Sequence, residues 1–185
     1  GIVTSAFFTA LISLIKYVAD PEDSLPTIVY WLLGSFNGAS AREVAYVALP
    51  VALAGTVLLK MRHVINILSL GDEEARALGL RVGVSRWAVL GASALLIAAT
   101  VSVSGIVGWV GLIVPHIARM LTGPNHARLL TVSMLIGAIY MIAMDTLARS
   151  ASYGEIPIGI LTALVGAPLF GVLLFRVQRQ GWRHD

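Results

Sequence analysis

The chain has 185 residues, of which 57% are hydrophobic and only 12% are charged, and its mean hydropathy is +0.85. This composition lies outside the range of ordinary soluble domains and predicts a membrane protein. Cysteine is absent, which excludes disulfides, thiolate-bound metals and thiol nucleophiles. The net charge of +3 does not indicate nucleic-acid binding, because the basic residues lie beside apolar segments, where they more often set membrane orientation.

The first residues are already apolar and have no charged flank or cleavage signal, so we expect the chain to be the later part of a longer protein. The four histidines are far apart, and no pair has the i, i+4 spacing of a helical metal site. We therefore expect no bound metal and no cofactor on this chain.

Apolar segments of spanning length recur along the whole chain. The uncharged run from Trp87 to Val114 is ambiguous, because it is too long for one upright span of about 20 residues. Its glycines permit a tight turn near Ser104, which would divide it into two spans. The predicted spans are then about 1–19, 44–62, 86–103, 107–122, 130–148 and 157–176.

The positive charges favour this division of the run. With two crossings, three of the 13 Lys and Arg residues (Lys16, Arg42 and Arg149) fall on one side and the other ten on the opposite side. With one crossing the same residues divide into six and seven. Because Lys and Arg concentrate on the cytoplasmic side, the sequence predicts an all-α polytopic membrane protein with six spans and a cytoplasmic C-terminus.

Two polar features accompany the spans. The outer loop 20–43 contains "LPTIVYWLLGSF", which is too short to span and predicts a helix lying at the membrane interface. Asp145 is the only acid within a predicted span, four residues before Arg149. This spacing favours a structural i, i+4 ion pair over a proton relay.

The stretch "SLGDEEARALGLRVG" (69–83) places charged residues and glycines in an otherwise apolar chain. Its acids would begin a helix of about two turns, where the helix dipole favours negative charge, and Gly79 would end it. Two interpretations follow, a solvated connector or a rigid docking element. The chain has no phosphate-binding loop, so energy for any work must come from another protein.

Four segments resemble one known family in order and spacing. They are "NILSLGDEEARALGL" (66–80), "SGIVGWVGLIVPHIARMLTGPNHARLL" (104–130), "DTLARS" (145–150) and "EIPIGILTALVGAPLFGVLLFR" (155–176). They resemble the FecCD-like permease subunits of type II ATP-binding-cassette (ABC) importers. Such permeases have ten spans, so the resemblance implies a single permease domain over 1–185 that corresponds to the fifth to tenth spans.

The resemblance also implies how the chain meets its partners. In such permeases the cytosolic segment between the sixth and seventh spans folds into two short helices that dock on the ATPase, which implies coupling helices within 69–85. By position, the coupling surface would contain Gly71, Glu74, Ala75, Arg76, Leu78 and Gly79. External arginines of the family pair with glutamates of the binding protein. Arg149 matches one such position, and Arg42 is a weaker candidate.

The family surrounds its translocation path with the fifth and tenth spans and short helices at their outer ends. The path residues implied here are Ser5, Thr9, Ser13, Gly159 and Gly166. A second interpretation stays open for all five, because small residues also let helices pack closely and hydroxyls also bond between helices.

The resulting prediction is a permease that catalyses no covalent chemistry and lies in a bacterial inner or archaeal plasma membrane. It would carry a metal chelate (an iron-siderophore, haem or cobalamin) inward by alternating access, with ATP hydrolysed on a separate cytosolic ATPase dimer. Its other partners would be an external binding protein, a second permease copy or homologue, and membrane lipid. The alternatives are an ion-coupled secondary carrier, which needs buried ionisable residues at mid-membrane, and a scaffold without transport activity.

Overall fold

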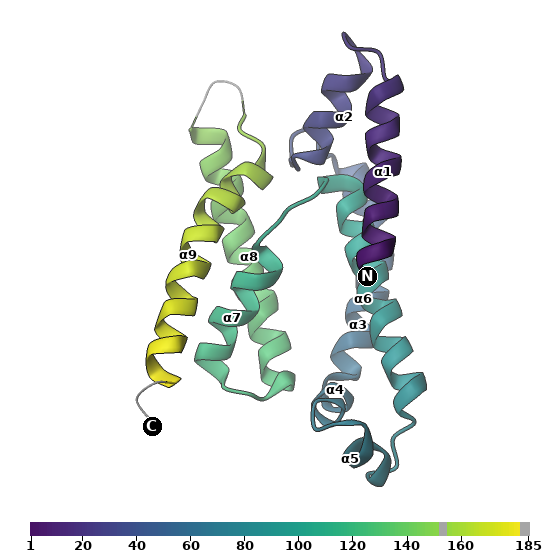
Figure 1. The fold of residues 1–185 in the computed structure, drawn as a ribbon, viewed down its shortest axis with the longest axis vertical. Helices are drawn as coiled ribbons and strands as arrows, with labels where there is room; N and C mark the ends of the chain where they lie inside the picture. The colour runs from purple at the N-terminus through teal and green to yellow at the C-terminus, as the bar shows by residue number, and fades with distance from the viewer. Residues whose placement is uncertain (152–154, 182–185) are drawn as a thin grey trace.

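The computed structural model describes residues 1–151 and 155–181, and over these residues it contains helices and no strands (Figure 1). In chain order the helices are α1 (Ile2–Val18), α2 (Ser24–Leu32), α3 (Ala41–Lys60), α4 (Arg62–Leu68), α5 (Asp72–Ala77), α6 (Val82–Ser104), α7 (Val110–Thr122), α8 (His126–Ser150) and α9 (Ile158–Gly181).

The helices stand in two upright groups (Figure 1). The first group contains α1 to α6, in which α3 packs along α6. The second contains α7 to α9, in which α7 packs along α8 and α9 contacts both. At the lower end of Figure 1 the short helix α4 packs against α8 and so joins the two groups.

The six predicted spans correspond to α1, α3, α6, α7, α8 and α9, which confirms the all-α polytopic prediction. In the described part of the chain, α3, α6 and α8 are long and apolar enough to cross a membrane. Helices α1 and α7 are shorter, and the apolar stretch of α9 covers Ile158–Val172. Helix α3 begins at Ala41 rather than near 44 because Ser40 and Glu43 form a capping box. The Ser40 N–H donates to Glu43 Oε2 at 2.7 Å.

The connection between α6 and α7 differs from the prediction. Instead of a tight turn near Ser104, residues 105–109 form an extended linker that crosses between the two groups (Figure 1). Gly105 at its start has a φ of +66°, and Trp109 at its end has a φ of +67°. These left-handed residues redirect the chain at both ends. Helix α7 therefore begins at Val110, later than predicted, and in the other group of helices.

Three backbone segments meet without intervening side chains where α2 ends, the linker starts and α9 begins. A Cβ added at any of the three glycines there would lie within 2.6 Å of a carbonyl oxygen of another segment. The Ser35 N–H donates to Ser104 O at 2.9 Å, and the Gly159 N–H donates to Leu33 O at 3.1 Å. We call this contact the glycine junction and define it by Gly34, Gly105 and Gly159.

Three short helices, α2, α4 and α5, lie outside the spans among the described residues. Helix α2 confirms that the loop 20–43 contains a short helix. Helix α4 was not predicted as a separate element, because its residues continue the apolar pattern of the span before it. The structure separates it from α3 at Met61, and α5 follows it after a short turn.

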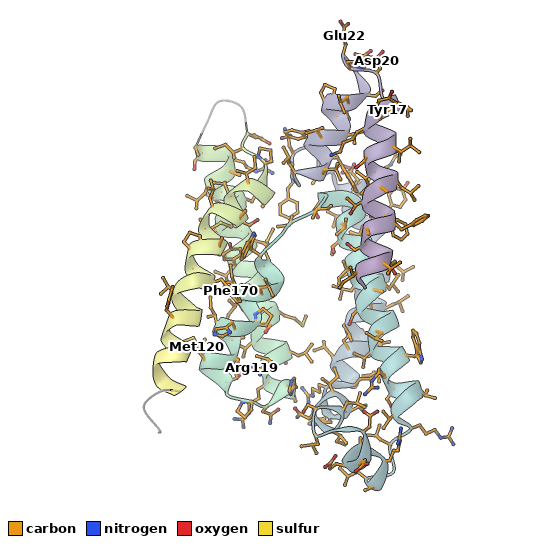
Figure 2. The ribbon with its side chains drawn as sticks, in the orientation of Figure 1. Tyr17, Asp20, Glu22, Arg119, Met120 and Phe170 are labelled. Carbon is orange, nitrogen blue, oxygen red and sulfur yellow. The ribbon has the colours of Figure 1, made fainter. Side chains whose placement is uncertain are left out.

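The helix ends form two opposite sides. The end of α8 and helix α2 lie at the upper end of Figure 1, and α4, α5 and the end of α9 lie toward the lower end. Figure 2 shows Asp20 and Glu22 at the upper end and Arg119 in the lower part. This arrangement agrees with the grouping of charges expected from the sequence, and the cytoplasmic assignment of the lower end stays a prediction.

Few side chains are buried among the described residues. One apolar cluster forms around Met144, Ala148 and Ile158, where α8 meets the start of α9. Large apolar side chains elsewhere stay exposed, such as Phe7 on α1 and Leu49 on α3. Apolar helix faces without a protein neighbour are suited to lipid or to further helices.

Candidate functional site

The polar segment folds into a compact element, residues 71–80, which we call the knob. Its helix α5 carries three acids in the first turn, as the helix dipole favours. At the other end Gly79, with a φ of +81°, donates its N–H to Arg76 O at 2.9 Å, and the Leu80 N–H donates to Ala75 O at 3.0 Å. These two bonds form a Schellman motif, which confirms that Gly79 ends the helix.

Most of the predicted coupling residues lie on the surface of the knob. At least partly exposed are Gly71, Glu74, Arg76, Leu78 and Gly79. Ala75 is instead fully buried, with α5 packed against α4 and α6, so its assignment is corrected to a packing position. Ala77, which was not predicted, is exposed beside Leu78, whose exposed fraction is 63%. The exposed surface therefore combines charges with one large apolar side chain.

The knob is attached to the start of α6 by an ion pair that sequence reasoning missed. Arg86 Nη2 donates to Asp72 Oδ1 at 2.5 Å, and Nη1 donates to Oδ2 at 3.4 Å. Two parallel bonds of this kind fix orientation as well as distance. The expected range 69–85 contains α5 and the beginning of α6, which starts at Val82. The other short helix, α4, precedes this range at residues 62–68.

The three predicted hydroxyl residues of α1 lie on one exposed face. Thr9 Oγ1 donates to Ser5 O at 2.8 Å, and Ser13 Oγ donates to Thr9 O at 2.9 Å. With Ala6 and Ala10 these residues line a shallow groove. The hydroxyl protons of Thr9 and Ser13 are used within the helix, so these two residues present small side chains and oxygen lone pairs on this face. Such a face suits a neutral path wall or close helix packing, and both interpretations of the sequence stay open.

The two predicted path glycines of α9 lie at packing contacts. Gly159 belongs to the glycine junction. Gly166 is buried, and a Cβ there would lie 2.7 Å from Trp109 Cβ and 2.8 Å from Ile113 Cδ1. Gly166 is therefore corrected from path lining to close packing. Gly159 is only partly buried and also lines a hollow between the end of α2, the linker and α9, so both interpretations stay open for it.

Arg149 lies at the upper end of α8 in an acidic setting. Its Nε donates to Asp145 Oδ2 at 2.9 Å, and its Nη1 lies 3.8 Å from Glu155 Oε1. The predicted i, i+4 ion pair is therefore confirmed, while the Arg149 side chain stays 48% exposed. Arg42, in the first turn of α3, is exposed and has no ion pair among the described residues.

A hollow of about 510 Å³ opens between α2 and the end of α6. Its lining is uncharged and mostly apolar, and consists of Pro26, Thr27, Tyr30, Trp31, Ser35, Asn37, Val103 and Ser104. No cluster of metal-ligating side chains is found in the described ranges, 1–151 and 155–181. The hollow and the α1 groove are therefore uncharged, whereas the knob and the end of α8 carry charged side chains.

Comparison with known proteins identifies the family. The FecCD transport family matches residues 1–176, which is nearly the whole chain. The chain belongs to the FecCD transport family. The family assignment implied by the sequence motifs is thereby confirmed.

Curated relatives of this FecCD-family chain are permease proteins named for different substrates. The molybdate import system permease protein MolB of Haemophilus influenzae is 48% identical over 98% of this chain. The hemin transport system permease protein HmuU of Yersinia pestis is 38% identical over 97%, and the vitamin B12 import system permease protein BtuC of Vibrio cholerae is 35% identical over 95%. The matches cover 54%, 54% and 53% of these relatives, so the FecCD-family chain spans about half their length.

A solved structure has the same fold as this FecCD-family chain. It is described as an inward-facing conformation of an ABC transporter assigned provisionally to the metal-chelate type. The match has a TM-score of 0.92 at 48% identity and covers 95% of this chain and 57% of the other. The arrangement of α1 to α9 is therefore that of a transporter's membrane subunit.

Proposed function

We propose that the chain is the C-terminal part of the permease of an ABC importer, and that the complete protein moves a metal-bearing nutrient into the cytoplasm. The observation that carries this proposal is the family match over residues 1–176, supported by a transporter structure of the same fold. Because the chain spans about half of its relatives, the proposal concerns the whole protein.

The proposed cargo is a metal chelate such as an iron-siderophore, haem or cobalamin, with the oxyanion molybdate as a second candidate. Relatives named for hemin and vitamin B12 support the chelates. The relative with 48% identity, named for molybdate, supports the oxyanion. The uncharged hollow and the hydroxyl face of α1 suit either cargo, because neutral walls leave selection by charge to a binding protein.

The energy of ATP hydrolysis would be transmitted to the permease through the knob. A cytosolic ATPase dimer would contact its exposed charges and Leu78, and ATP-driven closure of that dimer would move α4 and α5. A substrate-loaded external protein would dock at the opposite end, with Arg149 as the leading contact and Arg42 as a second. A second permease, either a copy or a homologue, would complete the path by covering exposed apolar faces within the membrane.

The alternatives receive less support. An ion-coupled carrier needs an ionisable group at mid-membrane, and Asp145 is instead paired with Arg149 near the end of α8. A scaffold without transport activity would not need the ordered knob.

The test is ATP-dependent uptake by the full-length permease, reconstituted in liposomes with its ATPase and binding protein. Labelled molybdate, a ferric siderophore, haem and cobalamin are compared one at a time, with ATP or a non-hydrolysable analogue inside. We expect accumulation of one cargo with ATP only. Uptake driven by an ion gradient without ATP would support the carrier, and no uptake of any cargo would support the scaffold.

A further inference from the structure

Helix α4 is joined to the start of α8 by the side chain of Asn66. Asn66 Oδ1 accepts the backbone N–H of His126 at 2.7 Å and lies 3.1 Å from His126 Nδ1. Asn66 Nδ2 donates to Asn125 Oδ1 at 3.2 Å. Asn125 Oδ1 also accepts the Ala127 N–H at 2.9 Å. We call Asn66, Asn125 and His126 the clasp.

The clasp completes the N-terminal cap of α8. The first N–H groups of a helix have no partner within it. Asn125 satisfies one of them, and Asn66, from a different helix, satisfies another. Asn66 bonds both the Asn125 side chain and the His126 backbone N–H. A shift of α4 along α8 would therefore break part of the N-terminal cap of α8.

The two ends of the clasp lead to opposite sides of the molecule. On one side α4 is followed directly by the knob. On the other side α8 is a continuous helix of 25 residues, about 37 Å long, that ends beside Arg149. Unlike α3, α7 and α9, it contains no proline that would bend it. Helix α8 is therefore a stiff connection between the clasp and the outer end.

We propose that Asn66 is a positioning residue that couples movement of the knob to α8, and through α8 to the outer docking end. The role of Asn66 rests on the proposed function, because it needs an ATPase at the knob and a binding protein at Arg149. Coupling between sites is reciprocal, so a binding protein outside would act on ATP hydrolysis inside through the same connection.

The experiment uses the complete transporter and compares Asn66→Ala with Ser69→Ala. Ser69 Oγ donates to Asn66 O at 2.7 Å, so Ser69→Ala loosens α4 locally and leaves the clasp intact. For Asn66→Ala we expect basal ATPase activity within about twofold of wild type. We also expect the stimulation by loaded binding protein, and the cargo moved per ATP, to fall at least about fivefold, the lower end of typical allosteric couplings. Ser69→Ala is expected to behave as wild type.

A double-variant series tests whether the clasp acts as one unit. If it does, Asn66→Ala combined with Asn125→Ala loses little more coupling than either change alone. Asn66→Ser is measured in parallel, because it is polar but too short to span the clasp, and it decides the question if Asn66→Ala does not assemble. Failure of both to assemble would assign Asn66 to folding and overturn the proposal.

Two further outcomes would also overturn it. One is unchanged cargo per ATP in Asn66→Ala, and the other is an equal loss in Ser69→Ala. The two proposals fail in different ways. A wild-type complex without ATP-driven uptake contradicts the proposed function, whereas normal uptake that is insensitive to Asn66→Ala contradicts only the role of the clasp.

Discussion

Single glycines decide how closely the helices of the second group approach. At Gly166 an added Cβ would lie less than 3 Å from both Trp109 and Ile113, whereas at Gly171, on the same helix, it would meet nothing within 4 Å. We expect Gly166→Ala to lower the free energy of unfolding of the full-length protein by about 1–3 kcal/mol, the usual effect of overpacking. Gly171→Ala should be neutral or slightly stabilising, since alanine favours helix over glycine. Thermal unfolding in detergent measures both, and equal effects would contradict the packing role of Gly166.

Arg149, at the end of α8, is the subject of a prediction about docking. If Arg149 pairs with the binding protein, Arg149→Ala should raise the concentration of binding protein that gives half-maximal transport. We expect an increase of about two- to fivefold, because one exposed ion pair contributes up to about 1 kcal/mol. Asp145→Asn should act in the opposite direction, because it removes the carboxylate that now holds the guanidinium at 2.9 Å. No effect of Arg149→Ala, together with a clear effect of Arg42→Ala, would move the docking role to α3.

At the scale of elements, the glycine junction fixes α2 against the linker and the start of α9. Gly34 and Gly38 both have positive φ, of +72° and +81°, but only Gly34 is packed, because a Cβ added there would lie 2.6 Å from Ile106 O. We expect Gly38→Ala to cost about 1 kcal/mol from backbone strain alone, and Gly34→Ala to cost about 2–4 kcal/mol. The difference between their unfolding temperatures isolates the junction. If the two variants unfold alike, α2 is held by other contacts.

The elements differ in how well the sequence predicted them. Apolar length and the distribution of Lys and Arg predicted six spans, because burial in lipid is a property of whole segments. The break at Met61 and the linker 105–109 were missed. Their positions depend on tertiary contacts, such as the packing of α4 on α8 and the close approach at Gly34, which leave no local pattern.

The same distinction applies to the candidate site. The position of the knob, and its end at Gly79, followed from the sequence, because acids, a short helix and a glycine cap are local features. Which face of α5 points outward did not follow. Ala75 was assigned to the surface through the family resemblance, although it is fully buried. Six residues are too few for a periodicity that would have revealed its burial.

At the scale of the whole molecule, the described residues leave many apolar faces uncovered, as expected of a chain that spans about half of its relatives. The knob is the part that would contact a cytosolic partner. We expect Ala77→Arg in the full-length protein to abolish co-purification of the ATPase, because it adds bulk and charge to an exposed position. Arginine favours helix, so α5 itself should persist.

The control for this prediction is Ala77→Ser, which changes little in size and should keep the ATPase bound. Both variants must elute from a sizing column as wild type does before co-purification is compared. Retention of the ATPase by Ala77→Arg would place the docking surface elsewhere on the cytosolic side.

The Schellman motif at Gly79 has a consequence for the strength of docking. Association loses conformational entropy when a flexible segment is ordered, at about 1–2 kcal/mol for each residue whose backbone becomes fixed. In this chain the backbone of the knob is already closed at Gly79 and anchored through Arg86 to α6 before any partner arrives. Little backbone freedom is left to lose, so, if an ATPase docks there as proposed, a small contact surface would be enough to hold it while the ATPase changes conformation.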